Sequence, residues 1–108
     1  MQIPVPRLNN MRFALKFQEN IQNLMRRAGY YFDRKQGEEL VFVRILGSAR
    51  SSYPRFHIYI KVSRETAEAN LHLDQKKPVY GTTTPHSAEY QGELIEREVQ
   101  RIKEITGP

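Results

Sequence analysis

The sequence predicts an α+β fold: a two-layer sandwich in which a four-stranded antiparallel sheet, built from β-hairpins, carries two helices on one face. Two segments, 10–28 and 84–106, predict the helices, because their apolar residues recur at spacings of three and four. Between them, residues 30–76 contain runs in which apolar and polar residues alternate, as in half-buried strands. Short loops join these runs, and consecutive strands joined in this way pair antiparallel.

Residues 1–9 are expected to form an extended arm, because Pro4 and Pro6 lack backbone donors and oppose a helix. The first helix is expected at 10–28, where Asn9 or Asn10 can cap the start and Gly29 can end the helix. Its apolar stripe consists of Ala14, Phe17, Ile21, Leu24 and Ala28.

Four strands are expected to form two hairpins. The first hairpin joins 30–35 to 40–46 through a short loop at Gly37, whose backbone can adopt a positive φ. The second hairpin joins 55–63 to 70–76 through a polar connection. Which face of the first two strands meets the helices stays open, because both of their faces are rather apolar.

The last helix is expected to start between Thr84 and Ser87, where a hydroxyl can cap it and Pro85 suits its first turn. Within it, Glu98 and Arg101 form an i,i+3 pair. If the arm counts as a short strand, the order is β-α-β-β-β-β-α, which resembles the half-repeat of TATA-binding-protein-like folds. The likeness concerns topology alone and implies no function. All of 1–108 is expected to form a single domain.

The composition excludes several classes of protein. The 108 residues include no cysteine, which excludes disulfide scaffolds, thiolate zinc sites and cysteine nucleophiles. No apolar run approaches the roughly 18 residues of a membrane span, and the first ten residues lack the apolar region of a signal peptide. We therefore expect a soluble, cytoplasmic protein without a membrane partner. No dinucleotide fingerprint, P-loop, nucleophile elbow or zinc-protease helix motif is present, so no cofactor is expected.

The charge is unevenly distributed along the chain. Lys and Arg number 17 against 12 Asp and Glu, a net charge of +5. Residues 1–86 hold 14 basic and 7 acidic side chains, whereas 87–108 hold 3 and 5. An excess of positive charge suits a polyanionic partner, although many small proteins are basic for solubility alone.

One face of the predicted sheet combines aromatic rings, guanidinium groups and imidazoles. Such rings can stack bases, while neighbouring Arg and Lys side chains neutralise phosphates. We therefore expect a nucleic-acid-binding module without catalysis of its own, whose partner is single-stranded nucleic acid or another polyanion. An ordinary solvated face with weak ion pairs is the alternative. The residues expected to contact nucleic acid are Phe42, Arg44, Arg55, His57, Tyr59, Lys61, His72 and Lys76.

Two other functions remain open. His57, His72 and Asp74 should share this face and could converge on one divalent metal, with His86 completing a metal-dependent hydrolase or nuclease. Without that metal, the sequence indicates no catalytic residue. Alternatively, the chain is a protein-interaction or homodimerisation domain, because unpaired strand edges invite a second chain.

The loop before the last helix is a candidate anion site. It places several hydroxyls and an imidazole ahead of a helix N-terminus, whose free backbone donors and partial positive charge attract phosphate. Simple helix capping explains the same residues. The candidate anion-binding residues are Lys77, Thr83, Thr84, His86 and Ser87.

Overall fold

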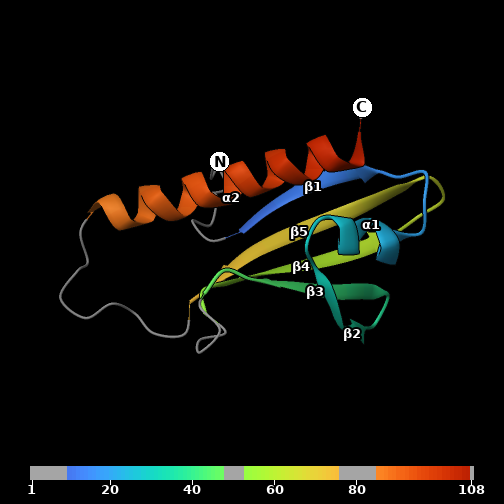
Figure 1. Ribbon diagram of the computed structural model, residues 1–108, viewed down its shortest axis with the longest axis horizontal. Helices are drawn as coiled ribbons and strands as arrows, with labels where there is room; N and C mark the ends of the chain where they lie inside the picture. Colours follow the sequence, from blue (N-terminus) through green and yellow to red (C-terminus); the bar gives the residue numbers. More distant parts are fainter. Residues whose placement is uncertain (1–9, 48–52, 76–84, 108) are drawn as a thin grey trace, which may run out of the picture.

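The computed structural model describes residues 10–47, 53–75 and 85–107, and for residues 85–90 it describes the backbone alone. Five strands form a single antiparallel sheet in the order β1-β5-β4-β3-β2 (Figure 1). The elements are β1 (Asn10–Lys16), α1 (Ile21–Arg27), β2 (Tyr31–Gln36), β3 (Glu39–Ile45), β4 (Arg55–Val62), β5 (Thr66–Asp74) and α2 (Pro85–Thr106).

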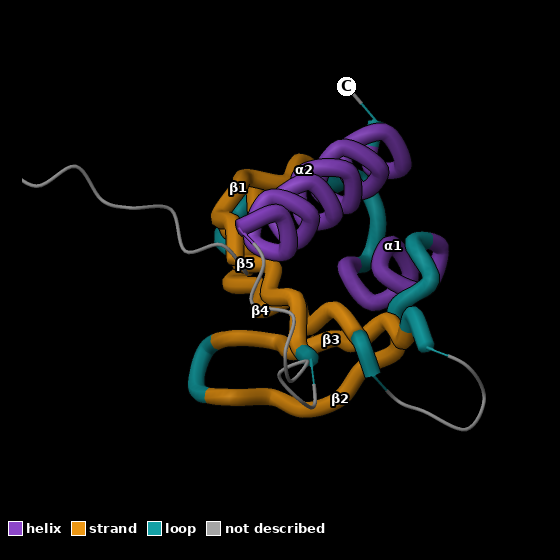
Figure 2. The backbone as a smooth tube through the Cα atoms, turned by 90° about the vertical axis from the view of Figure 1, so that its left-hand side faces the viewer, coloured by secondary structure: helices purple, strands orange, loops and turns teal. Residues whose placement is uncertain are grey.

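Both helices pack on the same side of the sheet (Figure 2), and α2 runs along β1 and β5 (Figure 1). Their apolar side chains meet those of the strands in one core, which includes Leu24 of α1, Ile102 of α2 and Ile58 of β4. The α+β class, the antiparallel sheet and the two helices are thus confirmed. No helix in the described ranges combines the length and the apolar character that a membrane crossing requires.

The prediction of four strands and a first helix at 10–28 is wrong. The first seven residues of that range are strand β1, which pairs with β5 and buries Phe13 and Leu15. Helix α1 begins only at Ile21, where the side chain of Asn20 accepts a 2.8 Å hydrogen bond from the backbone N–H of Gln22. Pairing with a distant strand therefore overrides a local pattern that also fits a helix.

The pairing of β3 with β4 decides which face of β3 meets the helices. Phe42 lies opposite Ile58 and Arg44 lies opposite Phe56, so both belong to the helix side of the sheet. Phe42 is only 1% exposed and is part of the core. The expectation that Phe42 and Arg44 lie on the solvent face with the polar residues of β4 is therefore wrong.

Several predicted residues lie outside the described part of the chain. They include Lys76, Lys77, Thr83 and Thr84. Helix α2 begins at Pro85, within the expected interval from Thr84 to Ser87. The side chains of His86 and Ser87 are not described, so the candidate anion site remains an expectation.

Candidate functional site

The side of the sheet turned away from the helices, called the outer face below, is organised in rows that cross the strands. Residues directly opposite one another in neighbouring strands share a face, so the register defines each row. The first row contains Asp74, Arg55 and Ile45, and the second contains Asn10, His72, His57, Val43 and Tyr31. The third contains Arg12, Asn70, Tyr59, Val41 and Arg34, and the fourth contains Ala14, Glu68, Lys61, Glu39 and Gln36.

The second row brings the two strand histidines together. His57 lies directly opposite His72, and the Nδ1 atom of His57 is 3.4 Å from Oδ2 of Asp74. Burial, reinforced by the positive charge of Arg55, lowers the pKa of His57 below its ordinary 6.5. His57 is therefore mostly neutral at pH 7, and it acts as a hydrogen-bonding group rather than as a cation.

Tyr59 is the aromatic residue at the centre of the outer face. Its ring centroid lies 5.2 Å from that of His72 in an edge-to-face arrangement and 6.4 Å from that of His57. Tyr59 is only partly buried. Two hydrogen bonds raise the pKa of Arg34: the bond to Asp33 has the larger effect and the bond to Tyr59 the smaller one. Val41 lies between Arg34 and Tyr59 in the third row and is fully buried.

The basic side chains of the outer face are paired with carboxylates. Arg55 Nε is 3.7 Å from Asp74 Oδ2, and Lys61 Nζ is 3.2 Å from Glu38 Oε2. Arg12 lies 4.0 Å from Glu68 across β1 and β5. Surface ion pairs of this kind contribute little to stability, and their partners can be exchanged for a phosphate.

The excess positive charge of the protein comes from segments that adjoin the strands of the sheet in the sequence. The described ranges hold 13 of the 17 basic residues and all 12 acidic ones. The remaining four, Arg7, Arg50, Lys76 and Lys77, fall in 1–9, 48–52 and 76–84, which contain no Asp or Glu. The strand ends next to these segments lie at one end of the sheet. Arg55 lies opposite both Ile45 and Asp74. In the neighbouring row, Asn10 lies opposite His72.

A groove of about 410 Å³ occupies the opposite end of the outer face, beside the turn between β2 and β3. That turn depends on Gly37, whose φ is +60°. Asn70 lines the groove and lies opposite Tyr59, and its buried Oδ1 atom has no hydrogen-bond partner among the residues that the structure describes. The residues that line the groove include Arg12, Glu38, Glu39, Tyr59, Lys61, Glu68 and Asn70.

The alternative metal site receives no support from the described residues. His57, His72 and Asp74 share the outer face, as expected from their strands. Within the ranges that the structure describes, however, no group of three or more His, Asp or Glu side chains could hold a metal ion.

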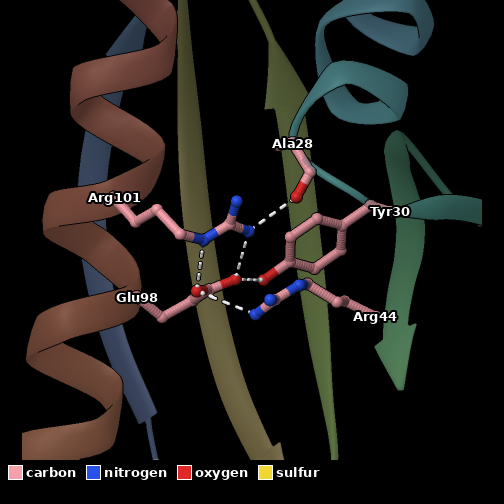
Figure 3. Close-up of polar contacts among 5 residues, drawn as sticks. All are labelled: Ala28, Tyr30, Arg44, Glu98 and Arg101. Carbon is pink, nitrogen blue, oxygen red and sulfur yellow. Dashed lines mark hydrogen bonds and ion pairs between the residues drawn. The ribbon is translucent and has the colours of Figure 1, made fainter. Parts of the chain in front are cut away.

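The sequence did not reveal a polar cluster on the other side of the sheet (Figure 3). Glu98 of α2, only 4% exposed, accepts hydrogen bonds from Tyr30, Arg44 and Arg101. Arg101 also donates a 2.6 Å hydrogen bond to the carbonyl of Ala28, at the end of α1. The i,i+3 pair of Glu98 and Arg101 is present, but it is the centre of this cluster rather than an isolated helix-surface pair. The sequence does contain a sign that Glu98 is buried, because Glu98 falls on the apolar stripe of α2 between Ile95 and Ile102.

The cluster holds Glu98 as a carboxylate. Burial alone would raise its pKa, but hydrogen bonds from Arg101 and Tyr30 and the charge of Arg44 outweigh burial, so the pKa is lowered. Burial and the adjacent carboxylate raise the pKa of Tyr30, which keeps its hydroxyl protonated as a donor. The cluster joins both helices to β3 and serves the fold rather than the outer face.

Comparison with known proteins leaves the site to be judged on its own geometry: no protein-family model, curated protein or solved structure matches the chain.

Proposed function

We propose that this protein binds single-stranded nucleic acid on its outer face, without catalysis of its own. The observation that carries the proposal is the position of the Tyr59 and His72 rings on the same face. These rings lie next to the end of the sheet that is flanked in the sequence by 1–9, 48–52 and 76–84, whose only charged residues are basic. An open antiparallel sheet with an aromatic residue and flanking cations suits unstacked bases and their phosphates.

Each residue has a distinct role in this proposal. Tyr59 stacks a base, and the neutral His57 and partly buried His72 exchange hydrogen bonds with base or sugar. Arg55 contacts a phosphate by exchanging its carboxylate partner, Asp74. Phe42 and Arg44 have no part in it, because they lie on the helix side.

Fluorescence anisotropy with labelled single-stranded RNA and DNA, at two salt concentrations, tests the proposal. Affinity should fall steeply as salt rises, since each phosphate contact releases counterions. Tyr59→Ala should weaken binding by about fivefold to a hundredfold, the range of one lost base stack. If the folded protein binds no oligonucleotide at low salt, the proposal is wrong.

A pair of arginine variants separates a local contact from a general charge effect. Arg55→Ala removes a cation from the outer face, and Arg64→Ala removes one from the exposed turn at the far end of β4. Arg55→Ala should weaken binding and reduce the salt slope by about one. Arg64→Ala should leave both nearly unchanged, and equal losses in the two variants would contradict binding at this face.

A further inference from the structure

The groove at the turn between β2 and β3 is unsuited to phosphate. Three carboxylates, those of Glu38, Glu39 and Glu68, line it together with the cations Arg12 and Lys61. Both cations already have a carboxylate partner. Arg12 Nη1 is 4.0 Å from Glu68 Oε1, and Lys61 Nζ is 3.2 Å from Glu38 Oε2. A group entering this groove therefore meets an excess of hydrogen-bond acceptors and a slight negative charge, which repel an anion and favour N–H donors.

Asn70 adds a specific demand for a donor. Its Oδ1 atom is buried without a partner in the described structure, and a buried acceptor without a hydrogen bond carries a free-energy cost that a ligand donor removes. Beside it stands Tyr59, directly opposite on β4. The groove thus offers a ring for stacking and, next to that ring, an acceptor that lacks a donor.

We infer that this groove accepts a nucleobase with an exocyclic amino group, stacked on Tyr59 with its amino group directed to Asn70 Oδ1. Adenine, cytosine and guanine carry such a group, whereas uracil and thymine do not. The inference rests on the proposed function and adds base selectivity to it. Phosphates lie outside the groove, toward the end of the sheet that holds Arg55.

A strict test changes only the amino group of the base. Oligonucleotides of equal length, containing either adenine or unsubstituted purine, are compared by fluorescence anisotropy as RNA and as DNA. The adenine strand should bind about tenfold more tightly, the effect of one hydrogen bond to an otherwise unpaired buried acceptor. Oligo-dC should likewise bind more tightly than oligo-dT, and the RNA and DNA arms show which backbone the protein prefers.

Three variants assign the selectivity to Asn70. Asn70→Leu removes the acceptor and should abolish the difference between adenine and purine, whereas Asn70→Asp retains an acceptor and should preserve it. Asn10→Leu makes the same chemical change on the outer face but outside the groove, and it should also preserve the difference. Circular dichroism confirms that each variant is folded before binding is compared.

The outcomes separate the two claims. Equal affinity for adenine and purine strands, with binding otherwise normal, would overturn the inference and leave the proposed function intact. Selectivity that survives in Asn70→Leu would overturn the role of Asn70. Absence of binding to every oligonucleotide at low salt would overturn the proposed function and the inference together.

Discussion

The hydroxyl of Tyr30 donates a 2.6 Å hydrogen bond to Oε2 of Glu98, which lies 68 positions further along the chain. Tyr30 precedes the edge strand β2, and Glu98 projects from the middle of α2, which packs on β1 and β5 (Figure 3). This contact therefore ties the last helix to the segment that leads into the opposite edge of the sheet. Arg44 and Arg101 hold the same carboxylate. Tyr30, Arg44 and Arg101, from three regions of the sequence, thus depend on one buried negative charge.

Replacing that charge should destabilise the fold. In Glu98→Gln, Arg44 and Arg101 lose their counterion in a partly buried setting, so we expect the free energy of unfolding to fall by about 2–3 kcal/mol. Urea denaturation measures the loss. Glu96→Gln changes an exposed carboxylate on the same helix and should alter stability by less than about 0.5 kcal/mol. Equal stability of Glu98→Gln and the parent protein would contradict a stabilising role for the cluster.

The stability of the protein should fall in acid, and Glu98 should account for part of the decline. Its pKa in the folded protein is lower than the usual 4.5, so the unfolded chain binds protons at a higher pH than the folded one does. The stabilising contribution is therefore present above about pH 4.5 and is lost as pH falls through the lower, folded value. Urea denaturation across this interval should show a shallower decline for Glu98→Gln than for the parent protein.

Two glycine variants should change stability in opposite directions. Gly29 has a φ of +90°, and a Cβ there would lie 3.4 Å from Nε of Arg44. Gly29→Ala should therefore cost about 1–2 kcal/mol. Gly92 lies inside α2 with open space around its Cα, so Gly92→Ala should stabilise by about 0.5–1 kcal/mol. Thermal unfolding of both variants measures the difference, and stabilisation by Gly29→Ala would refute the strain argument.

The imidazole of His57 should titrate below its ordinary 6.5. Burial is the main cause, and the charge of Arg55 adds to it, while Asp74 acts in the opposite direction. Arg55→Ala should consequently raise the pKa of His57, and Asp74→Asn should lower it further. An NMR titration of the histidine ring signals in the three proteins tests both signs. A shift of the same sign in both variants would contradict the placement of Arg55 and Asp74 beside His57.

The inward and outward sides of β4 were the most predictable part of the structure. In β4, the alternation of Phe56, Ile58 and Ile60 with polar residues predicts the inward and outward sides, and the structure agrees. The same rule was insufficient for β3, because Val41 and Val43 are as thoroughly buried as Phe42. Where both sides of a strand are apolar, the register with its neighbour decides, and a single sequence does not contain that register.

The first strand shows a second limit of sequence reasoning. Ala14 and Phe17 suit a helical stripe with Ile21, but Phe13 and Leu15 equally suit one side of a strand. The choice depends on β5, a partner far away in the sequence. The burial of Glu98 was not predicted for a related reason. A carboxylate on an apolar stripe is buried only where cations pair with it, and one of these, Arg44, comes from a distant part of the sequence.

The edge position of β1 has a consequence for the way the chain folds. Strands β2, β3 and β4 each pair with the next strand along the chain, so these contacts close short loops at low entropic cost. Strand β1 instead reaches across the sequence to β5, for example from Phe13 to Ala69, and such non-local pairing slows folding. The amide protons of β1 should therefore exchange with solvent sooner than those of the central β4, because the last strand to dock is the first to open.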